Sequence, residues 1–233
     1  MQANYGKIIE IGQNQDGSRQ GVITWRQDAG RLPAAGQYFQ AHNPKEASAP
    51  AAVTLFAGGL HPYAGGTNQL QTAPGIPQTW LPGDTLLLRG PLGSGFHIPE
   101  GVRRITLAAF GPFSAHLLPL AGEVLAAGGE VSLLMDGDFP ILPASIEVSP
   151  LADLAEALRW ADFAGCATSI EDLSTTRERL SAAGGHASMQ LLVIAPMPCG
   201  ALGGCGVCAF TSGKGQSLLA CEDGPVFPWS QIR

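Results

Sequence analysis

The feature that most constrains this sequence is a cysteine-rich segment at residues 198–227, PCGALGGCGVCAFTSGKGQSLLACEDGPVF. It holds four of the chain's five cysteines, spaced Cys199-x5-Cys205-x2-Cys208-x12-Cys221. Glycines are frequent between the first three of these cysteines. Glycine permits positive φ values and lets backbone N–H groups approach a bound group closely. The segment therefore has the composition of a loop that wraps around a metal centre.

The cellular compartment decides whether such cysteines hold metal or form disulfides. The first residues, MQANYGKIIEIGQ, contain no basic start followed by an apolar stretch, and no apolar run approaches membrane-spanning length. The sequence therefore predicts a cytoplasmic protein with no membrane partner. In that reducing compartment a cysteine cluster more often binds metal than forms disulfides.

Length and charge narrow the class of protein further. A chain of 233 residues can form two small domains and bury a core without disulfides. Hydrophobic residues make up 45% and charged residues only 14%, which is typical of a folded protein. The formal net charge of −6 argues against a nucleic-acid partner, because phosphate binding needs a concentrated excess of Lys and Arg.

Two kinds of metal centre fit four nearby thiols. Plant-type loops for a [2Fe–2S] cluster carry C-x4-C-x2-C with a more distant fourth cysteine, one residue shorter than this spacing. Four thiolates also satisfy a structural zinc ion, but zinc sites usually show two short Cys-x2-Cys pairs, and this segment has one. The spacing favours the [2Fe–2S] cluster, and a zinc-stapled structural subunit remains the alternative from a different class.

The strings CG…GGCGVCAF and LLACEDGPVF resemble the C-terminal end of the electron-transfer subunit of NAD-linked dihydroorotate dehydrogenases. These subunits are iron–sulfur flavoproteins of the ferredoxin-reductase superfamily. The extra residue between Cys199 and Cys205 departs from the family spacing, so the loop is expected to bulge there. The resemblance implies a hetero-oligomer with a catalytic flavoprotein subunit that oxidises dihydroorotate in pyrimidine biosynthesis.

The resemblance also implies a domain order. It predicts an FAD-binding β-barrel at residues 1–100, a doubly wound α/β domain of the nucleotide type at 101–197 and a [2Fe–2S] segment at 198–233. The first hundred residues support this order, because short apolar segments alternate with clusters of Gly, Pro, Asn and Asp at the spacing of a small barrel. The predicted strands lie within 5–13, 19–27, 36–43, 51–60, 68–73 and 84–93.

The resemblance assigns the flavin site to particular segments of this sequence. The segment GPLGSGF resembles the family's barrel-closing turn, and YAGGTNQL resembles the segment that receives the flavin pyrophosphate. The family's "R-x-x-S" strand corresponds to SAPAAVTLF, in which Thr54 stands at the hydroxyl position and no Arg precedes it. FAD is therefore predicted to bind, but more weakly than in relatives that keep the Arg. The candidate cofactor residues are Thr54, Gly65, Gly66, Thr67, Gly90, Gly93, Gly95 and Phe96.

The second domain is expected to keep its fold and to lose its nucleotide site. A strand, a turn, a helix over 113–127 and another strand form a βαβ unit. Where the family has a turn of the type GGGxGxAPL, this chain has AAFGPFSAHLLPL, so Pro112 and Phe113 place bulk where backbone must approach a pyrophosphate. Tight NADH binding is therefore not expected.

The rest of this domain is predicted more coarsely. Residues 152–166 are predicted as a second amphipathic helix and 187–198 as a buried parallel strand, while 137–151 is left unassigned. The five histidines are scattered, and none pairs with a carboxylate at a catalytic spacing, so His116 is expected to be a surface or satisfied core residue.

These observations predict an electron-transfer protein with no catalytic side chain of its own. It would carry electrons between FAD, a [2Fe–2S] cluster and a partner oxidoreductase. A second redox hypothesis makes the chain a repurposed subunit of another complex that passes electrons without using NAD.

Overall fold

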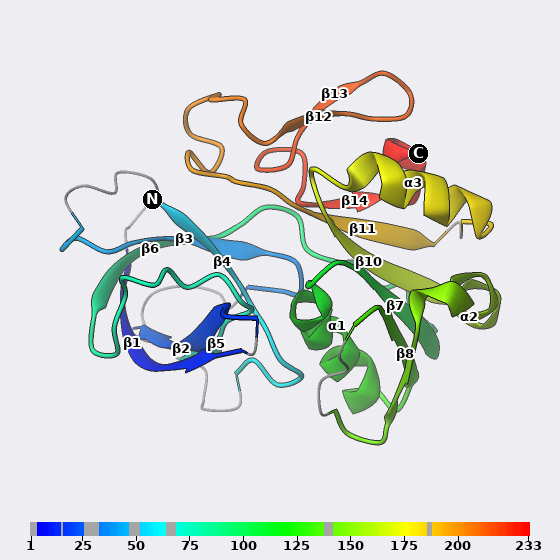
Figure 1. Cartoon of the computed structure of the whole chain (residues 1–233), viewed down its shortest axis with the longest axis horizontal. Coiled ribbons are helices and arrows are strands. Elements are labelled where there is room, and N and C mark those ends of the chain that lie inside the picture. Colours follow the sequence, from blue (N-terminus) through cyan, green and yellow to red (C-terminus); the bar gives the residue numbers. More distant parts are fainter. Residues whose placement is uncertain are drawn as a thin grey trace.

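The computed structural model describes residues 4–14, 16–25, 33–46, 52–63, 69–137, 142–185 and 188–233. Figure 1 shows an antiparallel barrel and a mainly parallel sheet side by side, with the segment of β12 and β13 above them. Within the described residues, no helix is long and apolar enough to span a bilayer.

An antiparallel sheet of six strands forms the first unit, in the order β4-β3-β6-β1-β2-β5. A bridge between Ala57 and Thr72 joins the ends of β4 and β5 and closes the sheet into a barrel. All six strands fall within the segments predicted from the sequence or extend them by one residue. Their bounds are β1 Asn4–Gln13, β2 Arg19–Trp25, β3 Tyr38–His42, β4 Val53–Phe56, β5 Gln69–Gln71 and β6 Thr85–Leu92.

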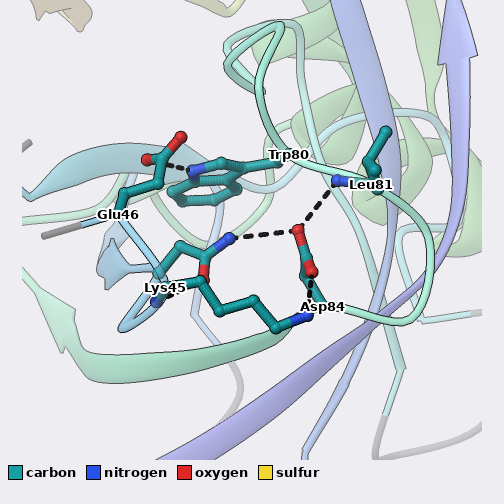
Figure 2. A network of polar contacts seen from close by, with 6 residues as sticks. Lys45, Glu46, Trp80, Leu81 and Asp84 are labelled. Atoms are coloured by element: carbon teal, nitrogen blue, oxygen red, sulfur yellow. Dashed lines mark hydrogen bonds and ion pairs between the residues drawn. The ribbon is translucent and has the colours of Figure 1, made fainter.

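A polar network holds the loop before β6 to the end of β3, as Figure 2 shows. The buried Asp84 carboxylate accepts hydrogen bonds from Asn43 Nδ2 at 3.0 Å, Lys45 Nζ at 2.8 Å and the Leu81 N–H at 2.9 Å. Its hydrogen bond with Lys45 is the largest of the effects that lower the pKa of Asp84. Because a buried carboxylate is costly without such partners, the network fixes one end of the barrel.

A six-stranded sheet in the order β14-β11-β10-β7-β8-β9 forms the second unit. Neighbouring strands from β9 to β11 are parallel, and β14 is antiparallel to β11. Because β7 lies in the middle and the chain winds outward in both directions, the sheet is doubly wound, as the sequence predicted. The strands are β7 Arg104–Phe110, β8 Glu130–Met135, β9 Ile146–Ser149, β10 Phe163–Ser169, β11 Met189–Ile194 and β14 Val226–Pro228.

Helices cover both faces of this sheet. The helix α1, Ser114–Ala126, lies on the face toward the barrel, and one core joins it to barrel side chains such as Tyr38 and Phe56. The helices α2, Leu154–Trp160, α3, Leu173–Ala182, and α4, Trp229–Ile232, pack into a second core on the other face. A side chain at Gly122 would collide with the Leu60 carbonyl, so glycine lets α1 lie against the barrel loop.

The predicted helix over 152–166 is wrong in its second half. A 3₁₀ turn at Leu151–Asp153 leads into α2, which ends at Trp160, and residues 163–169 form the strand β10. This strand is buried between β7 and β11, so it shows neither the alternation of a half-exposed strand nor many β-branched residues. Its FAGCATS sequence therefore looked like a continuation of the helix, and α3 was not predicted at all.

The C-terminal segment lies on both units. After β11 the chain forms the cysteine loop, the hairpin of β12 Ala209–Thr211 and β13 Ser217–Leu219, and then β14. The Ser94 N–H donates to the Gly224 carbonyl at 2.6 Å, and a side chain at Gly93 would collide with Pro225. The turn after β6 and the end of the chain are thus packed backbone against backbone.

Candidate functional site

A cavity of about 600 Å³ lies between the barrel and the carboxyl ends of β10 and β11. In doubly wound folds ligands bind outside the carboxyl ends of the parallel strands, so this is the expected place for a cofactor. The volume is within the range of small-molecule sites. The wall is formed by Ala52, Thr54, Phe56, Pro74, Gly75, Phe113, His116, Ser169, Glu171, Ile194, Ala195, Pro196, Met197 and Pro198.

The barrel contributes one face of β4 to the cavity. Ala52, Thr54 and Phe56 alternate along the chain, and side chains two residues apart in a strand point to the same side. The hydroxyl of Thr54, predicted from the sequence, therefore stands on the cavity wall between an alanine and an aromatic ring. Ala52 borders the cavity in the region where the family carries its Arg.

The α/β domain contributes an imidazole to the same cavity. His116 lies in the first turn of α1, with its ring 5.3 Å from that of Phe56 and 5.7 Å from that of Phe113, both edge-on. Its Nδ1 atom is buried and has no hydrogen-bond partner among the residues that the structure describes. Burial lowers the pKa of His116 to about 4, so the ring is neutral at pH 7. The Phe113 backbone carbonyl opposes this shift weakly as a hydrogen-bond acceptor, but it already accepts the His116 backbone N–H at 3.1 Å and lies outside hydrogen-bond geometry with Nδ1. His116 is therefore not the satisfied core residue that the sequence suggested.

The four cysteines of the C-terminal segment form two pairs. The Sγ atoms of Cys199 and Cys205 are 3.3 Å apart, and those of Cys208 and Cys221 are 3.2 Å apart. Two thiolates on one tetrahedral metal ion, with metal–sulfur bonds of about 2.3 Å, lie about 3.8 Å apart. Each pair is thus close to the spacing for one metal ion.

This pairing fits a binuclear cluster better than a single ion. A lone zinc ion needs all four thiols around one point, but among the described residues no three His, Cys, Asp or Glu side chains converge on such a point. A [2Fe–2S] cluster instead takes two thiolates at each iron. Cys208 and Cys221 are buried, whereas Cys199 is half-buried and Cys205 is exposed, so one pair faces the core and the other the surface.

The glycine-rich loop supplies hydrogen bonds to the outer pair. Backbone N–H groups of Cys205 and then Gly203 lower the pKa of Cys199 to about 6, which stabilises its thiolate. In the inner pair, burial is the main cause that raises the pKa of Cys221 to about 12. Thiolate ligation there depends on the metal, because a coordinating thiol is deprotonated by the ion itself.

The extra residue in the loop coincides with a distorted backbone. Ala201 has φ of +66°, a region that favours glycine, and it follows Gly200 with φ of +48°. A side chain at Gly200 would collide with Gln40 and Arg89, so the loop passes directly over the barrel at this position. The loop thus turns sharply where the sequence predicted a bulge.

Two barrel side chains hold the start of this loop. The Arg89 guanidinium on β6 donates to the carbonyls of Cys199, at 3.1 Å, and Gly200, and to Oε1 of Gln40. Gln40 on β3 donates through Nε2 to the Met197 carbonyl. We call these two residues the clamp. Sequence reasoning missed the clamp, although a lone cation inside the apolar TLLLRGPL strand and a buried amide in YFQAH were the available signals.

The other predicted flavin residues are placed elsewhere. Four of them are not among the residues that line the cavity: Gly90, Gly93, Gly95 and Phe96. Gly90 packs on Phe39, Gly93 on Pro225 and Gly95 on the Ala35 carbonyl, which also accepts a hydrogen bond from the Phe96 N–H. Their position joins the barrel to the C-terminal segment. The predicted pyrophosphate residues Gly65, Gly66 and Thr67 lie outside the described residues.

The turn after β7 is filled by the chain's own side chains. The buried Phe110 ring carries the Arg179 guanidinium 5.2 Å from its centre, and Phe113 lies against Gly111. No side chain caps the N-terminus of α1, whose first turn follows Pro112 and Phe113. Bulky rings and a residue without an N–H therefore occupy the place where a nucleotide-binding turn offers free backbone donors.

The C-terminal segment matches a known protein family. Residues 195–233 match the family model described as the iron-sulfur cluster binding domain of dihydroorotate dehydrogenase B. The iron–sulfur prediction is thereby confirmed. The matched residues include all four paired cysteines.

Solved structures share the fold along the chain. The structure of an NADH-dependent reduced ferredoxin-NADP oxidoreductase, from work on flavin-based electron bifurcation, has a TM-score of 0.71 at 18% identity and covers 98% of this chain and 89% of that chain. Phthalate dioxygenase reductase has a TM-score of 0.58 at 12% identity, covering 98% and 77%. An Amycolatopsis cytochrome P450 reductase has a TM-score of 0.59 at 15% identity, covering 82% and 69%. These matches confirm the predicted fold, and with the family match they support the resemblance to iron–sulfur flavoproteins of the ferredoxin-reductase superfamily.

Proposed function

We propose that the chain transfers electrons between FAD in the cavity beside Thr54 and a [2Fe–2S] cluster on the four paired cysteines. The observation that carries this proposal is the continuity of the two sites. Pro196, Met197 and Pro198 line the cavity, and the next residue, Cys199, is a cluster ligand. Electron transfer between two centres requires that they be held close together, and one short segment borders both.

The chain's own residues fit both groups. The cavity wall is largely apolar, as a stacked ring system requires, and it carries the Thr54 hydroxyl and the buried imidazole of His116. The comparisons support both cofactors predicted from the sequence. FAD supplies two-electron chemistry when bound, and the cluster supplies one-electron chemistry.

The clamp has a defined role in this proposal. Arg89 and Gln40 fix the backbone from Met197 to Gly200 on the barrel, so they fix the outer cysteine pair relative to the cavity. The cationic Arg89 also lies next to the cluster loop, where positive charge favours the more negative, reduced state of a bound cluster. It is therefore a positioning residue for the cluster.

The surface around Cys205 suits a partner protein. Leu202 and Val207 are 74% and 53% exposed, and no charged residue stands between positions 199 and 213. An apolar rim beside the exposed ligand fits a partner oxidoreductase such as the catalytic flavoprotein subunit of dihydroorotate dehydrogenase, as the family match suggests. A redox subunit of another complex would use the same surface, and reconstitution with candidate partners would distinguish the two.

The first experiment is a cofactor analysis of the purified, anaerobically handled full chain. We expect flavin absorption bands with a broad shoulder toward the red, together with two irons and one FAD per chain. Stoichiometric zinc without iron would contradict the cluster. A protein that stays free of flavin bands in excess FAD would contradict the flavin site.

A further inference from the structure

The cavity wall contains one buried polar side chain, the imidazole of His116, that has no role in cluster binding. His116 lies on α1, its ring is buried between Phe56 and Phe113, and within the described part of the chain its Nδ1 has no hydrogen-bond partner. We propose that His116 is a positioning residue for the flavin and that its imidazole forms a hydrogen bond with the polar edge of the isoalloxazine ring. This proposal rests on the proposed function, because it takes FAD as the occupant of the cavity.

An unpartnered buried nitrogen needs an explanation. Leaving a buried donor or acceptor unsatisfied costs about 1–3 kcal/mol, and nearly all such groups in folded proteins have a partner. Among the described residues, no group meets hydrogen-bond geometry with Nδ1 of His116, and the nearby Phe113 carbonyl already accepts the His116 backbone N–H at 3.1 Å. Hydroxyl groups such as that of Thr168 find partners at 2.8 Å elsewhere in the same domain. The partner is therefore expected from outside the chain, and His116 borders the cavity.

The surroundings hold the ring in one orientation. Two edge-on aromatic contacts, to Phe56 from the barrel and Phe113 from the turn before α1, fix the plane of the imidazole. Thr54 stands two residues before Phe56 on the same face of β4. A planar ligand in the cavity thus meets one hydroxyl from the barrel and one imidazole from the α/β domain.

The chemistry of the ring edge matches a neutral imidazole. The pyrimidine side of isoalloxazine carries carbonyl and ring-nitrogen acceptors and one N–H donor, so either nitrogen state of a neutral His can bond with it. The burial of His116 keeps it uncharged, so the contact is a neutral hydrogen bond and not an ion pair. Pro196 lines the same cavity, so a flavin held by this bond would lie beside the start of the cysteine loop.

The test compares the full-length wild type with His116→Phe, which keeps an aromatic ring of similar shape and removes both nitrogens. We expect the dissociation constant for FAD to rise about tenfold and the flavin absorption bands to shift. His97→Phe is the matched control, because His97 is exposed and outside the cavity, and it should bind FAD as the wild type does. His116→Asn, which returns a polar group near the Nδ1 position, should recover most of the affinity.

The outcomes separate this inference from the proposed function. If the wild type binds FAD and His116→Phe binds it with unchanged affinity and unchanged bands, the role of His116 is wrong and the flavin site stands. If the wild type does not bind FAD, the proposed function itself fails. Iron content reports folding independently, because the cysteine pairs lie outside the altered contacts. Should His116→Phe lack iron, His116→Leu takes its place, and unchanged FAD affinity and unchanged flavin bands in that variant would overturn the inference.

Discussion

The cluster segment at residues 195–233 and the α/β sheet before it have kept different properties of related proteins. The cluster segment holds the four candidate cysteine ligands in two close pairs, and it matches the family model of an iron-sulfur cluster binding domain. The sheet has the doubly wound strand order, parallel pairing and helices on both faces, yet the turn after β7, where such folds bind nucleotides, contains Phe110, Pro112 and Phe113.

The difference shows how unequally sequence change affects fold and chemistry. A sheet is held by many apolar contacts, so substitutions in one turn leave it standing. A metal site or a phosphate turn depends on a few atoms, and its loss removes the activity at once. We therefore expect the cluster segment to bind a redox-active cluster and the sheet to serve as a scaffold that does not bind NADH tightly.

Removing a cluster ligand should have the largest effect. Cys208→Ala deletes one thiol of the buried pair, so we expect loss of nearly all iron and of the red-extending absorption. Cys166→Ala is the matched control, because Cys166 is a fully buried thiol in β10 outside the cluster loop, and it should keep its iron. Full iron content in Cys208→Ala, measured by metal analysis, would refute the ligand assignment.

The second effect concerns the sheet. Because the turn lacks free backbone donors, the isolated full chain should not reduce its flavin with micromolar NADH at a useful rate. Rapid anaerobic mixing followed at the flavin bands measures this directly. Prompt bleaching would mean that another surface binds the nucleotide, and the sheet could then not be regarded as a scaffold without a nucleotide site.

The clamp links the two regions to the barrel. Arg89→Met roughly keeps the length of the side chain but removes the hydrogen bonds that Nη2 shares among the Gln40, Cys199 and Gly200 oxygens, so the free energy of unfolding should fall by about 2 kcal/mol. Hydrogen exchange at residues 197–200 should rise with it. Arg103→Met, at an exposed position, is the control and should change neither quantity. Equal hydrogen exchange in both variants would show that Arg89 does not hold the backbone of the cysteine loop.

The smallest predicted effect restores what the flavin site lacks. Ala52→Arg adds a guanidinium on the cavity wall two residues before Thr54, next to Ala51, where the R-x-x-S spacing puts the family's Arg. We expect it to pair with the flavin pyrophosphate. The dissociation constant for FAD, measured by fluorescence titration, should fall about tenfold. Ala52→Leu controls for added bulk; if it tightens binding equally, the charge is not the cause.

Sequence patterns predicted most of the fold, and the misses have clear physical causes. The six barrel strands were found because each has turn residues at both ends. The strand β10 was missed because it is buried on both faces, which removes the alternation, and because its Ala-rich FAGCATS sequence continues a helical pattern.

The site was predicted unevenly for a related reason. The candidate cysteine ligands lie close together in sequence, so their spacing was enough to predict a metal centre. The contacts of Arg89 with Cys199 and Gly200 cross more than a hundred residues, and only the folded chain shows them. The same holds for His116, because only the folded chain shows that Phe56 and Phe113 bury its ring and that Nδ1 has no partner among the described residues. The spacing of residues in the sequence can predict a site formed by one short segment. Contacts between residues far apart in the sequence can be identified only in the structure.

The central claim is that electrons pass within one chain between the flavin cavity and the paired cysteines. Anaerobic photoreduction of the FAD-loaded full chain, followed at once by absorption and by electron paramagnetic resonance, tests it most directly. We predict that reduction of the flavin bands is accompanied by bleaching of the cluster absorption and by the signal of a reduced [2Fe–2S] centre. A fully reduced flavin beside a cluster that is intact but stays oxidised would contradict the claim.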